Sequence, residues 1–191
     1  MIRTLAAISI FLAFPVDSFA QTPPHHGHSH TPKVQTAPGQ PHQPAPYAGL
    51  DRREVKSLSE QGLTDLRAGK GMGVALPAEL QGYPGPTHVL ELADKLNLTP
   101  DQRARIAQLH REMRSEAIKA GEILISTEHA VDQFFASGSV GETALLTVTR
   151  QAAEARAQVR FAHLRFHLST KAVLSAEQLA IYGKARGYGA L

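Results

Sequence analysis

A five-residue pattern occurs twice in the chain and constrains its fold more than any other feature. The two copies read LTPDQ at residues 98–102 and LSAEQ at residues 174–178. In each copy a hydroxyl can accept a hydrogen bond from the first turn of a helix, and the Gln three residues later can bond back to the cap's own N–H. This arrangement, a capping box, predicts a helix start at each copy, with the cap pairs Thr99 with Gln102 and Ser175 with Gln178.

Apolar residues recur every three or four positions between the two boxes, as in helices with one buried face. We expect long helices over residues 100–135 and 142–170, the first with a break in its apolar stripe at residues 127–128. The first would be roughly 50 Å long at 1.5 Å per residue. Because the turn between them, residues 137–141, is short, the two should form an antiparallel hairpin.

Short helices are predicted on either side of this hairpin, over residues 59–68, 74–80, 88–96 and 176–184. No segment alternates with the period of a strand, so the predicted fold class is all-α. The short helices cannot cover both long ones, and apolar surface should remain along one side. That surface would serve either as a dimer interface or as a binding surface, or as both.

The N-terminus has the features of a secretory signal. Arg3 precedes an apolar run over residues 5–14, and small residues at Ser18 and Ala20 precede a cleavage site. We expect residues 1–20 to be removed and the mature chain to begin near Gln21. An uncleaved membrane anchor is the weaker interpretation, since the run is too short to span a bilayer.

The amino-acid composition excludes several classes of function. The chain has no cysteine, which excludes thiol catalysis, cysteine metal sites and disulfides. Its formal charge of +3 is a mild excess that does not indicate a nucleic-acid partner. No motif of an enzyme is found, and we expect the protein not to be one.

A tail rich in proline and histidine covers residues 21–49 and should be disordered. It is followed by a region of short helices and turns, residues 50–86, which contains the glycine-rich stretch GKGMG at residues 69–73. Four imidazoles close together in the tail can bind one divalent ion such as Zn²⁺, Cu²⁺ or Ni²⁺. These candidate ligands are His25, His26, His28 and His30. A polar linker with incidental histidines is the alternative.

A second candidate metal pair is His163 and His167, which lie one turn apart on the second long helix. Glu112, Glu116 and His110 on the first long helix are possible further ligands. However, arginines surround the pair, and a basic solvated face is the favoured interpretation. His88 and His129 are expected to be isolated residues at the surface.

The second long helix also carries a basic stripe beside its apolar one. Arg156 and Arg160, with Phe134 and Phe135 near the hairpin tip, form a candidate face for binding acidic or partly unfolded chains. Ion pairing with acids of the first long helix and burial of the two rings in a core or interface are the alternatives.

The two boxes around a long helical hairpin, in an exported chain without cysteine, resemble the Spy/CpxP family of periplasmic proteins. The resemblance rests on residues 98–102 and 174–178 and covers residues 87–191. It implies a cradle-like helical subunit that dimerises. It also implies one of three roles: an ATP-independent chaperone for unfolded periplasmic proteins, a regulator of a two-component stress sensor, or a periplasmic metal sensor.

Two functional hypotheses follow. The first is a periplasmic chaperone that binds unfolded clients, needs no cofactor and could be modulated by a metal. The second is a heavy-metal sensor or buffer that uses the histidines. The sequence does not choose the client or the metal.

Overall fold

The structure, a computed structural model, describes residues 45–188 of the 191-residue chain. The predicted signal, residues 1–20, and most of the predicted tail lie outside the described residues. Within residues 45–188 every regular element is helical, which confirms the all-α class. The elements are η1 Leu50–Arg52, α1 Glu60–Arg67, α2 Leu76–Glu79, α3 Pro86–Glu91, α4 Pro100–Ala136, α5 Glu142–Lys171 and α6 Ala176–Arg186.

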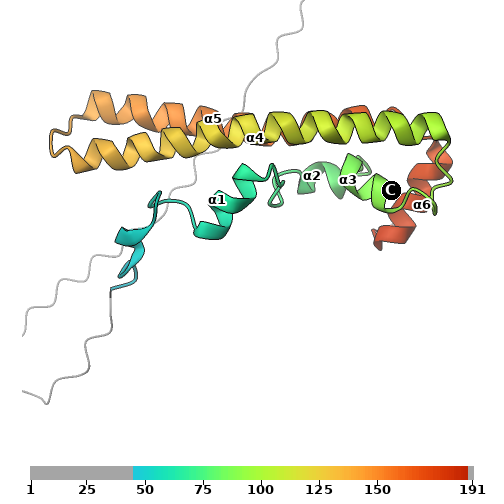
Figure 1. The fold of residues 1–191 in the computed structure, drawn as a ribbon, viewed down its shortest axis with the longest axis horizontal. Helices are drawn as coiled ribbons and strands as arrows, with labels where there is room; N and C mark the ends of the chain where they lie inside the picture. The colour runs from blue at the N-terminus through green and yellow to red at the C-terminus, as the bar shows by residue number, and fades with distance from the viewer. Residues whose placement is uncertain (1–44, 189–191) are drawn as a thin grey trace, which may run out of the picture. The chain divides into compact units, whose positions relative to one another are not determined.

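The two long helices, α4 and α5, lie side by side and form the longest part of the described region (Figure 1). Their bounds agree with the prediction to within about one residue. The apolar stripes expected from the sequence are the faces that meet. On α4 the buried residues include Ile106, Leu109, Met113 and Leu124, and on α5 they include Val159, Ala162 and Phe166.

The break in the α4 stripe contains a buried carboxylate. Glu128 accepts a hydrogen bond from the hydroxyl of Ser57 at 2.7 Å and pairs with Arg156 of α5 at 2.5 Å. A charged side chain is tolerated in a core only when such partners are present. The residue that interrupts the apolar pattern therefore joins the segment before α1 to both long helices.

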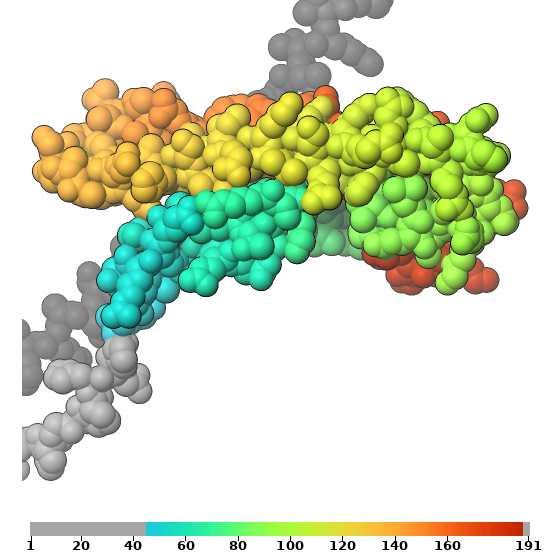
Figure 2. Space-filling model, viewed as in Figure 1, coloured from blue at the N-terminus to red at the C-terminus, as the bar shows by residue number. Residues whose placement is uncertain are grey.

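Helices α1 and α3 pack against α4, while α2 and α3 contact α5. Val55, Leu63 and Leu66 form a core cluster with α4 and α5. Gly121 permits the close approach of α1, because a Cβ atom at this position would lie 2.7 Å from the backbone oxygen of Leu66. A second cluster at the other end joins α3, α4, α5 and α6 and includes Tyr182. In Figure 2 the surface beneath α4 is recessed between the segments of α1 and α3.

In place of the helix predicted over residues 88–96, the structure has a shorter helix that starts earlier in the chain. Helix α3 covers Pro86–Glu91, with Pro86 in its first turn, where a missing N–H costs nothing. After Glu91 the chain turns and reverses at Asn97, whose φ of 48° is left-handed. The apolar residues that suggested a longer helix, Ala93 and Leu96, are buried from within these turns.

Both capping boxes are formed. Thr99 accepts a hydrogen bond from the backbone N–H of Gln102, and the Gln102 side chain accepts one from the N–H of Thr99. Ser175 and Gln178 repeat the arrangement at the start of α6. All four residues therefore cap the helices that the sequence assigned to them.

The two boxes are also bonded to each other. The Nε2 atom of Gln102 donates to Oε1 of Gln178 at 3.0 Å, and the Nε2 atom of Gln178 donates to Oε1 of Gln102 at 2.9 Å. Each amide donates its second hydrogen to a backbone carbonyl, Val173 for Gln102 and Leu96 for Gln178. Every donor and acceptor of both amides is thus used. The repeated motif forms one reciprocal contact, which we call the glutamine pair, between the start of α4 and the start of α6.

Burial along the long helices is uneven. No residue between 129 and 151 is buried, whereas buried residues recur on both long helices outside that range. None of the helices between residues 45 and 188 combines the length and the apolar character needed to cross a membrane.

Candidate functional site

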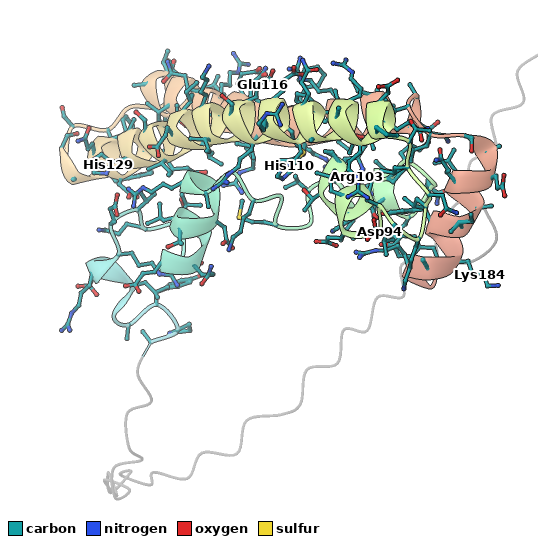
Figure 3. The ribbon with its side chains drawn as sticks, turned by 45° about the vertical axis from the view of Figure 1, so that its right-hand side comes forward. Asp94, Arg103, His110, Glu116, His129 and Lys184 are labelled. Atoms are coloured by element: carbon teal, nitrogen blue, oxygen red, sulfur yellow. The ribbon has the colours of Figure 1, made fainter. Side chains whose placement is uncertain are left out.

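A cavity of about 440 Å³ lies on the side of α4 that faces the short helices. The glycine-rich stretch of residues 69–73 lines one part of it, and α2, α3, α4 and α5 line the rest. Figure 3 shows His110 on this side of α4. Five residues whose side chains can bind a metal cation line the cavity: Glu79, His88, His110, His163 and His167.

Glu79 is the buried centre of a hydrogen-bond network beside the cavity. Its carboxylate accepts bonds from the Gly85 N–H at 3.0 Å, from His88 Nδ1 at 3.1 Å and from the hydroxyls of Tyr182 and Tyr188. These donors come from α3, from α6 and from segments next to them. The carboxylate therefore ties the C-terminal helix to the segment before α3.

The network sets the ionisation of its members. Burial acts to raise the pKa of the Glu79 carboxyl, but hydrogen bonds from Tyr182, Gly85 and His88 outweigh it and hold that pKa below its usual value. Burial, together with the Glu79 carboxylate, raises the pKa of the Tyr182 hydroxyl. Glu79 is thus an anion and Tyr182 a neutral donor near pH 7.

Two histidines of the cavity have their protons fixed by acceptors. His167 Nδ1 lies 2.6 Å from the carbonyl oxygen of Tyr83 and 3.6 Å from Glu79 Oε2. His88 Nδ1 lies 3.1 Å from Glu79 Oε1. Since a carbonyl and a carboxylate only accept, each Nδ1 carries the proton, and Nε2 of the neutral ring has a free lone pair.

His163 lies one turn before His167 and is only 4% exposed. Its Nε2 atom is buried and has no hydrogen-bond partner. Burial lowers the pKa of the His163 imidazole, and the nearby His167 lowers it further. The ring edge lies against Gly71, where even a Cβ atom would come within 3.5 Å of Nδ1.

The cations at the cavity already have partners. Lys70 pairs with Asp65 at 3.0 Å, and the Arg114 guanidinium donates to the carbonyl of Ala68 at 3.3 Å. Glu79 contributes a negative charge. The cavity therefore offers imidazole side chains beside a carboxylate.

These positions correct two interpretations made from the sequence. His163 and His167 are not on a solvated basic face but are buried against α2, α3 and the glycine-rich stretch. His88 is not isolated, since it binds Glu79. Of the further ligands considered, only His110 lines the cavity. Glu112 bonds with Gln108, and Glu116 pairs with Arg165. His129 is exposed, as expected, and bonds with Gln133.

The basic stripe of α5 is partly neutralised by acids of α4. Arg156 pairs with Glu128, and Arg165 pairs with Glu116. Arg160 is exposed and forms no ion pair with any described residue. Phe134 and Phe135 pack edge to face with their ring centroids 5.2 Å apart, and Phe135 is the more exposed of the two.

A row of exposed apolar residues runs along α5 on the side opposite its buried face. Its largest members are Phe161 and Leu168, exposed by 59% and 61%, and Leu146, exposed by 49%. Ala153 and Ala157 are also exposed and continue the row, since steps of three, four and seven residues keep one helical face. We call the set of Leu146, Ala153, Ala157, Phe161, Leu164 and Leu168 the outer stripe. Leu164 is only partly exposed, and Arg150 lies on the same face between Leu146 and Ala153.

The candidate metal ligands of the tail, His25, His26, His28 and His30, lie outside the described residues. Among residues 45–188, no three His, Asp or Glu side chains are already close enough together to hold a metal ion. The sequence reasoning missed Glu79 and Tyr182 and gave His88 no partner. No periodicity or motif spacing links these three residues, which come from α2, α6 and α3.

Comparisons of this chain with models of protein families, with curated proteins and with solved structures found no match.

Proposed function

We propose that the protein is an ATP-independent periplasmic chaperone that binds unfolded chains through the outer stripe of α5. The observation that carries this proposal is the stripe itself, a row of apolar side chains of which all but Leu164 are exposed. From Leu146 to Leu168 it extends about 33 Å at 1.5 Å per residue. An exposed apolar surface with polar residues beside it is typical of an interaction site.

The shape and charge of the surface favour unfolded clients over one folded partner. The stripe lies on a convex helix rather than in a pocket, so it can contact any apolar segment of an extended chain. Arg160 lies beside it without an ion pair among the described residues and would attract acidic segments. The secretory features of residues 1–20 support export to the periplasm.

The same stripe is suited to a second copy of the chain, and a cradle-like dimer built on an antiparallel hairpin is part of the proposal. Client binding and dimerisation would then use overlapping residues. Regulation of a two-component sensor is a further role that the resemblance to the Spy/CpxP family implies.

An aggregation assay with the mature chain tests the proposal. The chain should suppress aggregation of a chemically denatured model client at near-stoichiometric ratios without ATP. The variant Phe161→Ser/Leu168→Ser should lose most of this effect. The matched control is Ile123→Ser on α4, since Ile123 is exposed by 57% but has the polar Lys119 and Ser126 one turn away.

The outcomes separate the two uses of the stripe. Absence of suppression by the unchanged chain refutes the chaperone. If the stripe serves dimerisation alone, Phe161→Ser/Leu168→Ser becomes monomeric in sedimentation experiments while the unchanged dimer does not suppress aggregation.

Metal binding by the tail is the second candidate function, favoured by the density of imidazoles at residues 25–30. Calorimetric titration with Zn²⁺, Cu²⁺ and Ni²⁺ tests it on the mature chain and on a variant with all tail histidines changed to Asn. A dissociation constant of about 10 μM corresponds to roughly −7 kcal/mol. Binding no tighter than this by either protein would exclude a sensor.

A further inference from the structure

We propose that the cavity beneath α4 is a second metal site, separate from the tail, which binds a divalent transition-metal ion through His163 and His167 of α5 with His110 or His88 completing the set. Imidazole nitrogen is a preferred ligand of Zn²⁺, Cu²⁺ and Ni²⁺. The site would join α5 to α3 or α4 within the described region.

The first argument is the unpartnered nitrogen of His163. A buried polar atom without a hydrogen bond is rare in folded proteins, because it loses its interaction with water and gains nothing. His163 Nε2 is such an atom, in a side chain that lines the cavity. A leucine would fill a purely structural position without that cost, so the imidazole at residue 163 indicates a ligand.

The second argument is the arrangement of the neighbouring rings. Histidines that bind metals usually donate their other N–H to a carbonyl or a carboxylate, which fixes the free nitrogen as the ligand. His167 does this with Tyr83 and His88 does it with Glu79. In both rings Nε2 is therefore the nitrogen that these two bonds leave free for a ligand.

The third argument is charge. The two cationic side chains that line the cavity, Lys70 and Arg114, are bonded to Asp65 and to the carbonyl of Ala68. Glu79 is a buried carboxylate at the cavity wall and offsets part of a divalent charge. Because no three ligands are preassembled in the described region, binding must include rotation of side chains such as His110, which is only partly buried.

Calorimetry and thermal unfolding with Zn²⁺ test the site in a background that removes the tail. In the mature chain, His25, His26, His28, His30 and His42 are changed to Asn. We expect this background to bind one Zn²⁺ with a dissociation constant below about 10 μM and to unfold at a higher temperature when Zn²⁺ is present, because the ion binds the folded state. No binding below about 100 μM would overturn the proposal.

Two further substitutions in the same background localise the ion. His167→Asn retains a donor for the Tyr83 carbonyl but lacks Nε2, and His163→Leu removes the unpartnered atom. Each should weaken Zn²⁺ binding at least tenfold and abolish the rise in unfolding temperature. The control is His129→Asn on the exposed side of α4, which should change the affinity less than twofold.

Measurements without metal show whether His163 is a metal ligand or a residue that the fold itself requires. His163→Leu should unfold at the same temperature as the background or higher when no Zn²⁺ is present, since it removes an unpaired buried group. If His163→Leu and His167→Asn both fold and bind Zn²⁺ as tightly as the control, the site is refuted. If His163→Leu does not fold, His163 is structural, and the proposal as stated fails.

Discussion

The glutamine pair should contribute more to stability than two independent helix caps. Gln102→Ala removes four hydrogen bonds, to the Thr99 N–H, to the Val173 carbonyl and two to Gln178. A neutral hydrogen bond contributes about 0.5–1.5 kcal/mol net. The freed side-chain entropy offsets up to about 2 kcal/mol. We therefore expect Gln102→Ala to lower the free energy of unfolding by about 2–3 kcal/mol, and Gln178→Ala to do the same.

A double-mutant cycle isolates the contact between the two boxes. Two of the four bonds of each glutamine are shared, so each single substitution already removes both. The double variant should therefore cost about 1–3 kcal/mol less than the sum of the single variants. Urea unfolding followed by circular dichroism measures all four proteins, provided that the denaturant dependence of the free energy is unchanged.

The control is Gln108→Ala, on the exposed face of α4, where the amide contacts only Glu112 and Arg105. It should change stability by less than about 0.5 kcal/mol. If the effects of Gln102→Ala and Gln178→Ala add to within about 0.5 kcal/mol, the two boxes are separate caps and the reasoning is refuted.

Three further predictions concern the core and the buried network. Gly121→Ala should destabilise the protein by about 1–3 kcal/mol, because its Cβ would lie 2.7 Å from the Leu66 oxygen. Gly141→Ala, whose Cβ would have nothing within 4 Å, should cost less than about 1 kcal/mol, through the weaker N-cap that Ala gives α5. Glu79→Gln should be less stable than the unchanged protein at pH 7. That difference should shrink as the pH falls through the lowered pKa of Glu79, since a depressed carboxyl stabilises only when ionised; a difference that grows in acid would contradict this. Ser57→Ala should cost about 1–2 kcal/mol in denaturant unfolding by leaving the buried Glu128 with one partner fewer, whereas an unchanged midpoint would show that Ser57 contributes nothing.

Periodicity was sufficient to predict the long helices. The apolar steps of α4 and α5 are local in sequence, and the capping residues Thr99 and Ser175 mark where α4 and α6 begin. Helix α3 was misplaced because Ala93 and Leu96 are apolar at helical spacing but are buried from turns. Apolar residues at helical spacing indicate burial, but residues in turns can be buried as well as residues in helices.

The cavity could not be predicted in the same way. Glu79 and His88 lie far from His163 in the chain and meet it at the cavity only when α2 and α3 pack on α5. The link between the boxes is a similar case, since Gln102 and Gln178 are 76 residues apart and each already had a local role as a cap. Contacts of this kind arise from tertiary packing. In a single sequence their only sign is a residue whose type is not explained by its own helix or turn.

The absence of buried residues between 129 and 151 has a consequence for how the molecule opens. In this part of the molecule α4 and α5 are stabilised only by their contact with each other, because the short helices do not pack against them there. Amide hydrogens in this part should exchange with solvent through local opening events, whereas those of residues near Ile106 and Phe166 should exchange only when the whole domain unfolds. The long pair would therefore separate from its turn at residues 137–141 inward, and the outer stripe begins, at Leu146, within the part that opens first.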